Sequence, residues 1–548
     1  MDDEFNMRTI KIGNDDPNEQ SKTIGMSAQG CKSYVFHADE NTSIRLIDTP
    51  GTGDTREIVQ DKKNFESILK YIGQHKHLNG IYFLLKPNNA RLNVVFRFCI
   101  QELLSHLHRN AKDNVSFCFT NTRSTFYHPG NTINPLKKQF SDLKERSKVE
   151  IKINKDTSYC FDNKSVRFLT AIKNGITFTE ENQISFAKSW ERSVGESLRL
   201  LKHLVTRTPY KVKDTLSLND ARNIVILLSK PLAEMGQLIQ MNISKIQDQQ
   251  KEIANSTQTI GQLEDRLYIE QIDLEPMQLG YPRTVCTSHN CVKVLSIGSR
   301  KKINYKTNCH ERCYLSGVAC DMVNNAALQT CSAITNGICQ KCLCNWTKHI
   351  HITYENKHVT VRVIDQNVEK EIKKKRSFRE TKKAVISTYQ KRIDDLKKEQ
   401  QTIAHINVRF AQFLRQSAIA PFNDAYADYL DHFITEENMK KNADPNNYDN
   451  RILEGLKSTK KEYMEKIMVI KKAIENDDPS LQPISPDDIA NFEQQLYKLS
   501  LNGQTLKKIK EQAEFGQNNK FVYEEKHVKP SQRTHGSLLS RIVSLAFN

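Results

Sequence analysis

The sequence predicts an α/β fold at the N-terminus, arranged in three layers, followed by a mainly α region of coiled-coil arms with an inserted zinc-binding module. Three observations predict this. Apolar runs typical of buried strands alternate with amphipathic stretches over the first 205 residues. Helix-forming residues dominate from about residue 216 onward, and nine of the 13 cysteines lie between residues 286 and 344. A chain of 548 residues is also too long for a single hydrophobic core.

The α/β region begins with a predicted hairpin at residues 32–48 and continues with alternating helices and strands. Alternation of this kind predicts a mainly parallel sheet with helices on both faces. The expected elements are a helix at 64–75, a strand at 80–85, a helix at 91–110, a strand at 114–120, a helix at 135–146, a strand at 159–161 and a helix at 181–204.

The most informative motif is an apolar strand that runs into the tetrapeptide at residues 48–51. In phosphate-binding GTPases an Asp at this point reaches Mg²⁺ through water, and the Gly backbone N–H meets the γ-phosphate. The usual companion, Gly-x-x-x-x-Gly-Lys-Ser/Thr, does not occur upstream. The nearest substitute, residues 13–23, carries three acidic side chains that would repel phosphate. We therefore expect nucleotide binding by this chain to be weak.

Further short motifs lie at 27–31 (Ser-Ala-Gln-Gly-Cys), 120–123 (Thr-Asn-Thr-Arg) and 160–163 (Cys-Phe-Asp-Asn). With these motifs, about 200 residues of the chain resemble the septin-like GTPases, specifically the immunity-associated (avirulence-induced) branch. The resemblance implies an incomplete Ras-like G domain at residues 1–205 that lacks its phosphate loop, with GTP or GDP and Mg²⁺ as ligands. The residues implied for nucleotide and magnesium are Asp48, Thr49, Pro50, Gly51, Ser27, Asn121, Thr122, Arg123 and Asn163.

The missing phosphate loop has a structural consequence within this resemblance. The strand before that loop lies in the middle of the sheet, so its loss separates the magnesium strand from the strand at 81–85 and leaves two unpaired edges. Two interpretations remain open, a chain truncated at its amino end and a nucleotide-free pseudo-GTPase. A third interpretation is an ordinary α/β domain in which the Asp-Thr-Pro-Gly motif at residues 48–51 occurs by chance. GTPase activity is expected only of a form with a phosphate loop, and no residue of this chain is assigned as catalytic.

Two helical arms, at 216–280 and 362–435, flank the cysteine block. Asn242 and Gln249 lie three residues after the seam positions Ile239 and Ile246 of the first arm, where a coiled coil normally has apolar residues. Because both are polar, we expect an imperfect coiled coil. We expect an antiparallel helical hairpin with the cysteine block at its tip, and a parallel coiled-coil dimer is the alternative. The seam residues are Ile239, Ile246, Ile253, Ile260 and Leu267 in the first arm, with the helix expected to reach residue 272, and Ile386, Tyr389, Ile393, Leu396, Ile403, Phe410 and Leu414 in the second.

The block at 281–355 predicts two structural zinc sites, because short loops with two donors each suit a tetrahedral ion. A closed set of four protein donors leaves no position for a substrate, which indicates a structural role. The predicted ligands are Cys286, Cys291, Cys309 and Cys313 in one site, and Cys339, Cys342 and Cys344 with His349 or His351 in the other, while His310 could replace a neighbouring cysteine.

The C-terminal part predicts a linker at 436–449, a helical segment at 450–515 and a flexible tail at 516–548. A short apolar stripe at 538–547 favours packing onto the body or fraying over membrane contact. The chain shows no secretory signal and no apolar run of about 20 residues, which together with reduced thiolates predicts a cytoplasmic protein.

The net charge of +17 invites a nucleic-acid interpretation. The densest basic run, at 373–383, lies among glutamates without aromatic residues, so a solvated helix face is favoured. The predicted function is a GTP-binding or degenerate GTPase scaffold whose nucleotide state controls assembly through its coiled coil, with protein partners or a second copy. The alternative is a zinc-containing coiled-coil scaffold without nucleotide binding, and a ubiquitin ligase or a nucleic-acid binder is the third class.

Overall fold

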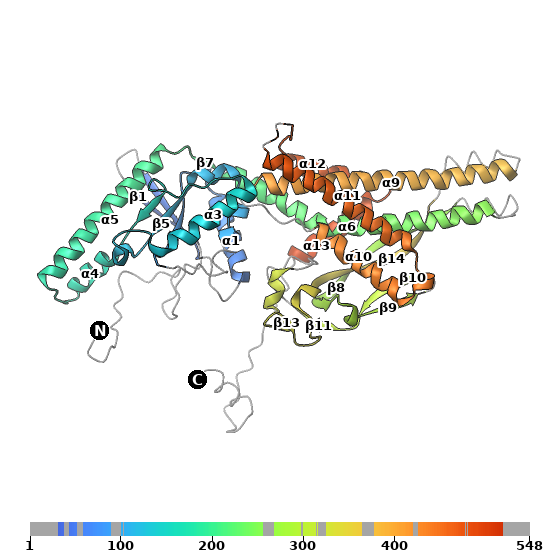
Figure 1. Ribbon diagram of the computed structural model, residues 1–548, viewed down its shortest axis with the longest axis horizontal. Coiled ribbons are helices and arrows are strands. Elements are labelled where there is room, and N and C mark those ends of the chain that lie inside the picture. The colour runs from blue at the N-terminus through green and yellow to red at the C-terminus, as the bar shows by residue number, and fades with distance from the viewer. Residues whose placement is uncertain are drawn as a thin grey trace, which may run out of the picture.

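The structure is a computed structural model that describes residues 31–37, 43–51, 58–88, 100–101, 103–255, 268–297, 300–313, 315, 325–363, 378–419, 426–476, 478 and 480–518. Figure 1 shows the α/β region at one end of an elongated molecule and long helices that extend to the other end. A smaller module rich in strands lies beside these helices.

A three-stranded parallel sheet forms the centre of the N-terminal region. Its order is β4 (Ile81–Leu85), β5 (Val115–Phe119) and β6 (Ser158–Cys160). All five residues of the central strand β5 are buried, as its apolar sequence predicts for a strand covered on both faces. Helix α3 (Ile133–Ser147) covers one face and places the ring of Phe140 edge-on to Phe117, with centroids 5.3 Å apart. The predicted parallel α/β arrangement is confirmed for this region.

Helices α4 (Lys164–Lys173) and α5 (Glu180–Thr206) follow the last strand of this sheet. Helix α4 was not predicted from the sequence. The two helices meet through the stacked rings of Phe168 and Phe186, with centroids 4.6 Å apart. Helix α5 leaves several apolar side chains in solvent, including Val194 and Leu198, which are 41% and 55% exposed.

The hairpin predicted near the magnesium motif is present. Strand β1 (Lys32–His37) pairs antiparallel with β2 (Ser43–Asp48). Among the described strands, this hairpin and the parallel sheet form two separate sheets, so β2 does not pair with β4. Helix α1 (Ile58–Ile72) contacts the hairpin through Tyr71, whose hydroxyl donates to Ser33 Oγ at 2.7 Å.

The two arms form an antiparallel pair of helices, α6 (Val212–Asn255) and α9 (Phe378–Gln416). Gln240 Nε2 donates to Gln400 Oε1 at 2.9 Å, and Gln250 Nε2 donates to the Ile386 carbonyl at 3.2 Å. Residue numbers in α9 fall from 400 to 386 as those in α6 rise from 240 to 250, so the two helices run in opposite directions. The seam residues of α6 within the described part are at most 1% exposed, and those of α9 are buried apart from the half-buried Ile386. Ile260 and Leu267 lie outside the described residues.

A long pair of strands, β8 (Ile269–Cys286) and β14 (His349–Val363), folds back along α6 (Figure 1). This corrects two expectations. The first arm is not helical to residue 272, because β8 begins at Ile269. The cysteine block is not at the tip of the helical hairpin, because these strands carry it back. The polar positions of α6 account for the difference, since Asn242 and Gln249 hydrogen-bond to the backbone of β8.

Four further helices complete the core around α6 and α9. The predicted linker at 436–449 is partly wrong, because α10 extends through Ala443. In the described part of the chain, none of the helices combines the length and apolar character needed to cross a membrane. The four helices are α10 (Tyr426–Ala443), α11 (Asn450–Glu475), α12 (Pro486–Tyr497) and α13 (Gly503–Asn518).

Candidate metal centre

Three antiparallel strands bring the cysteines and histidines of the module together. Their order is β11 (Asn308–His310), β8 and β14. His349 lies opposite Cys286, and His351 lies opposite Thr284. Since residues two apart share one face of a strand, this register places two histidines of β14 beside the cysteine end of β8.

The first group of donors consists of four thiols, Cys286, Cys291, Cys342 and Cys344, whose Sγ atoms all lie within 4.8 Å of one another. The Sγ atoms of Cys291 and Cys344 are 3.8 Å apart. A tetrahedral ion with Zn–S bonds of about 2.3 Å would hold two sulfur ligands at about this separation. The group therefore has the number, type and spacing of donors that a structural zinc ion requires.

The second group consists of Cys309, Cys339, Cys342 and His349, again within 4.8 Å of one another. His349 is fully buried, and its Nε2 lies 3.3 Å from Cys342 Sγ. Its Nδ1 lies 3.0 Å from the carbonyl oxygen of Asn345. Because a carbonyl only accepts, Nδ1 carries the proton and Nε2 presents its lone pair to the centre. The imidazole is thus fixed in the tautomer that binds a metal.

A tight hairpin positions Cys339. Strands β12 (Ile334–Thr335) and β13 (Ile338–Cys339) are joined by Asn336 and Gly337, which have φ angles of +51° and +80°. Positive φ at both central residues is the geometry of a type I′ turn, for which Asn-Gly is the favoured pair. The backbone N–H of Leu343 then donates to the Cys339 carbonyl at 2.9 Å, which closes the loop that carries three cysteines.

A third group contains His310, Cys313 and Cys331. The two sulfurs are 3.7 Å apart, and His310 Nδ1 lies 3.3 Å from Cys331 Sγ. His310 Nε2 lies 3.2 Å from Ser332 Oγ, so a protonated Nε2 can donate a hydrogen bond to this hydroxyl oxygen and leave the lone pair of Nδ1 free for a metal. The hydroxyl of Thr284 donates to Cys313 Sγ at 3.1 Å. Within the described residues this group offers three donors.

Burial disfavours the charged form of two thiols and two imidazoles in the module. It raises the pKa of the Cys286 and Cys309 thiols above the ordinary value. It lowers the pKa of His349, and it lowers the pKa of His351 to about 4. Both effects favour the uncharged form, since a buried charge without a partner is costly. Neutral imidazoles bind metals directly, whereas the thiols must lose protons to an arriving cation.

The structure groups the predicted ligands differently from the sequence analysis. Cys286 and Cys291 lie with Cys342 and Cys344, and not with Cys309 and Cys313. The cause is the pairing of β8 with β14, which brings the end of the module onto its beginning. His351 belongs to none of the three groups, and its Nδ1 lies 3.5 Å from Thr284 Oγ1.

Cys331 was not predicted as a ligand, and it joins His310 and Cys313 in the third group. Cys331 lies 18 residues from Cys313, so short spacings along the chain do not indicate it. The separate His310–Cys313 pair, two donors three residues apart, was the available signal.

Four of the residues that the resemblance assigns to the nucleotide, Asn121, Thr122, Arg123 and Asn163, follow β5 and β6 at the carboxyl edge of the parallel sheet. The backbone N–H and the hydroxyl of Thr122 donate to the Phe161 carbonyl at 3.1 and 3.0 Å, so the loops that follow β5 and β6 meet. Asn121 has a left-handed conformation with φ +58°. The guanidinium of Arg123 lies 4.3 Å from the centre of the Phe186 ring. Asn163 is exposed and precedes α4.

Residues 48–51, which the resemblance also assigns to nucleotide and magnesium, lie at the end of the hairpin strand β2. Asp48 is exposed at the end of β2, opposite Lys32, and Thr49 is also exposed. Pro50 is buried, and the Gly51 carbonyl accepts from Asn64 Nδ2 at 3.0 Å. In the described part of the chain, the two halves of the implied nucleotide site belong to separate sheets. Ser27 lies outside the described residues.

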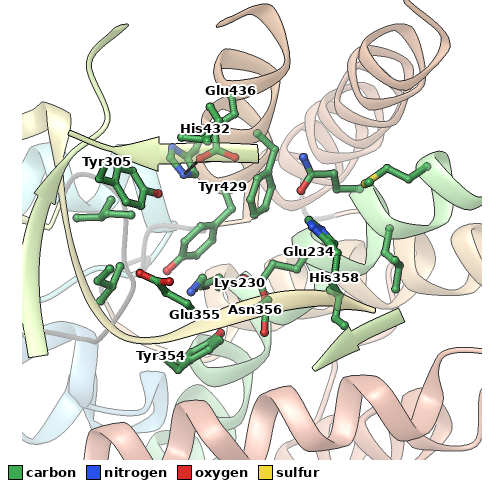
Figure 2. A pocket seen from close by; sticks show the side chains of 18 of the residues that line it. Lys230, Glu234, Tyr305, Tyr354, Glu355, Asn356, His358, Tyr429, His432 and Glu436 are labelled. Carbon is green, nitrogen blue, oxygen red and sulfur yellow. Dashed lines mark ion pairs between the residues drawn. The ribbon is translucent and has the colours of Figure 1, made fainter. Parts of the chain in front are cut away.

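A cavity of about 190 Å³ lies between α6, α10, β10 (Arg300–Tyr305) and β14. Figure 2 shows Tyr429 and His432 from α10 facing Lys230 and Glu355 across it. Two pairs of neighbouring side chains lie at its wall, with Lys230 Nζ 3.5 Å from Glu234 and His432 Nε2 3.4 Å from Glu436. Lysines and glutamates both line this cavity, so its wall carries charges of both signs.

One part of the chain matches a known family of domains. Residues 278–355 match a domain of unknown function (DUF8206). This segment contains every residue of the three donor groups, so the matched domain coincides with the candidate metal centre. No curated protein and no solved structure matches the chain. The resemblance to septin-like GTPases therefore gains no support from a named relative.

Proposed function

We propose that the chain is a zinc-stabilised scaffold protein, in which a metal-bound module braces a helical arm that binds protein partners through residues 216–420. The observation that carries the proposal is the pair of four-donor groups built on β8, β11 and β14. Closed sets of cysteine and histidine donors characterise structural zinc, whereas a catalytic zinc keeps a position open for water or substrate.

The composition of the module's interior supports a structural role for the metal. Among the described residues, the buried cluster at its centre contains six cysteines and two aliphatic residues, Leu328 and Ile334, and a second small cluster adds Val285, Ile350 and Ile352. These five aliphatic side chains contribute about 8–15 kcal/mol, which does not offset the entropy of ordering a segment of this size at about 1–2 kcal/mol per residue. Zinc binding supplies folding free energy to small domains of this kind.

The module is also joined firmly to the arm. The Oγ1 of Thr505 in α13 donates to Asp273 Oδ1 of β8 at 2.8 Å. Arg392 of α9 donates to the side chain of Gln271 at 2.6 Å. The same strand therefore contacts two helices through its side chains and α6 through its backbone, so order in the module supports the geometry of the arm.

Sedimentation velocity of the full chain tests the scaffold proposal, with and without zinc and with and without Mg²⁺-GTP. We expect zinc removal to change the sedimentation coefficient and GTP to leave it unchanged. A change that depends on GTP and disappears in Asp48→Ala would replace this proposal with a nucleotide-switch function. Unchanged sedimentation and unchanged secondary structure after complete zinc removal would also overturn it.

A second candidate function is nucleotide binding by the α/β region, as in the septin-like class. One observation favours it: the Thr122–Phe161 contact joins two loops at the carboxyl edge of a parallel sheet, where such sheets bind ligands. Titration with a fluorescent GTP analogue and Mg²⁺ tests it. This candidate predicts saturable binding that Asp48→Ala weakens, and binding that Asp48→Ala leaves unchanged would exclude the assigned magnesium role.

A further inference from the structure

We propose that the first two donor groups form one binuclear zinc cluster in which the thiolate of Cys342 bridges both ions. This inference deepens the proposed structural role and rests on it. Its basis is that Cys342 belongs to both groups, with its Sγ within 4.8 Å of every other donor in each.

The number of donors requires sharing if both ions are tetrahedral. The two groups together contain seven different donors, six cysteines and His349. Two tetrahedral ions offer four positions each. All positions are filled only when one donor serves both ions, and Cys342 is the residue common to both groups. One ion would then have four sulfur ligands, and the other three sulfurs and one nitrogen.

The surroundings of Cys342 suit a bridging thiolate. Its side chain is half-buried at the junction between the groups, with His349 Nε2 3.3 Å from its sulfur. The loop that carries it is fixed by two backbone hydrogen bonds, from Cys339 N to the Cys344 carbonyl and from Leu343 N to the Cys339 carbonyl, both 2.9 Å. These bonds hold Cys339 and Cys344, which belong to different groups, on either side of Cys342.

A hydrogen bond from Lys341 ties the two donor groups together. Lys341 is the residue before Cys342, and its Nζ donates to the Asn308 carbonyl at 2.7 Å. This bond links the loop of Cys342 to the strand of Cys309.

The proposal is tested by counting tightly bound zinc by native mass spectrometry in the full chain, after equilibration with a competing chelator. Cys331→Ala serves as background, because it removes a donor from the third group. We expect two ions in this background, one after adding Cys344→Ala or Cys309→Ala, and none after adding Cys342→Ala. The single-ion variants are matched controls, since each also removes one thiol from the module.

Loss of only one ion in the Cys342→Ala variant would overturn the bridge while leaving structural zinc intact. Absence of zinc from the background protein would overturn the proposed function as well. A second measurement needs no substitution, so a failure of Cys342→Ala to fold does not affect it. This measurement is ¹¹³Cd NMR of the unsubstituted chain loaded with cadmium. Two cadmium resonances that both couple to the β-protons of Cys342 support the bridge, and resonances with no cysteine in common contradict it.

Discussion

The side chain of Asn242 exchanges two hydrogen bonds with the backbone of Ile272. Its Nδ2 donates to the Ile272 carbonyl at 2.9 Å, and its Oδ1 accepts from the Ile272 N–H at 2.7 Å. Asn242 is 2% exposed, so both bonds are shielded from water. A polar residue in an otherwise apolar helical seam thus acts as the attachment point for the strand that leads to the metal centre.

Asn242→Leu should lower the free energy of unfolding of the arm by about 2–6 kcal/mol, because two buried backbone groups each lose a partner at about 1–3 kcal/mol. Hydrogen exchange of the β8 amides should rise before that of α9. Asn223→Leu is the matched control, since Asn223 is exposed on the same helix. Equal losses of stability in the two variants would show that the contact with Ile272 contributes nothing.

Gly337→Ala should weaken zinc binding about 5- to 30-fold. An alanine at φ +80° costs about 1–2 kcal/mol in backbone conformation, and this cost lowers the zinc affinity because the turn folds when the metal binds. The new Cβ itself would make only ordinary contact, 3.4 Å from Trp346 Cδ1. Competition with a chromophoric chelator measures the affinity. Gly280→Ala is the control, since its Cβ meets nothing within 4 Å and its φ is not positive. Equal affinities in the two variants would contradict the role of this turn.

Asp449 should make the junction of α6 and α11 sensitive to acid. Burial pushes the pKa of its carboxyl upward, but hydrogen bonds from Arg451 and Ser244 outweigh burial and hold the pKa below the ordinary 3.8. A carboxyl with a depressed pKa stabilises the fold above about pH 4, and this contribution is lost as pH falls through the folded-state pKa.

Asp449→Asn should therefore lower the thermal midpoint at pH 7, with a loss of about 1–3 kcal/mol in the free energy of unfolding. The difference in free energy of unfolding between variant and wild type should begin to narrow near pH 4 and should be lost as the pH falls through the depressed folded-state pKa of Asp449. Thermal denaturation followed by circular dichroism from pH 3 to 7 measures this. Asp220→Asn, at an exposed position of α6, serves as the control. A gap that stays constant over this range would rule out the carboxylate as its source.

Zinc removal should unfold the module selectively. With the metal gone, its interior retains few buried aliphatic side chains, whereas β5 keeps a shell of phenylalanines and leucines around it. Hydrogen exchange after chelation should show lost protection at 308–313 and 326–349 and unchanged protection at 115–119. Simultaneous loss in both regions would indicate that the α/β region depends on the metal, which the account does not predict.

Much of the local structure follows from sequence pattern. The continuous apolar run at β5 predicts a strand buried on both faces, and all five of its residues are buried. Apolar residues that recur every seven positions, such as Ile239, Ile246 and Ile253, lie on one face of a helix and are buried together. The short cysteine spacings likewise indicate metal chemistry. Long-range partners do not follow in this way, since they depend on how separate elements meet.

Two examples show this limit. Asn242 breaks the hydrophobic repeat, and sequence alone does not reveal that a strand 30 residues later will use it. The donor groups combine Cys286 with Cys344 because β8 pairs with β14, a contact between segments about 60 residues apart. Spacing along the chain identifies the donors, but only the strand register sorts them into groups.

Zinc K-edge X-ray absorption of the full chain, purified without added chelator, tests the central claim that residues 286–349 form a metal-bound structural centre. We expect bound zinc with a first shell dominated by sulfur at about 2.3 Å and a minor nitrogen contribution. A protein that folds without zinc, or a shell made of oxygen and nitrogen alone, would contradict it.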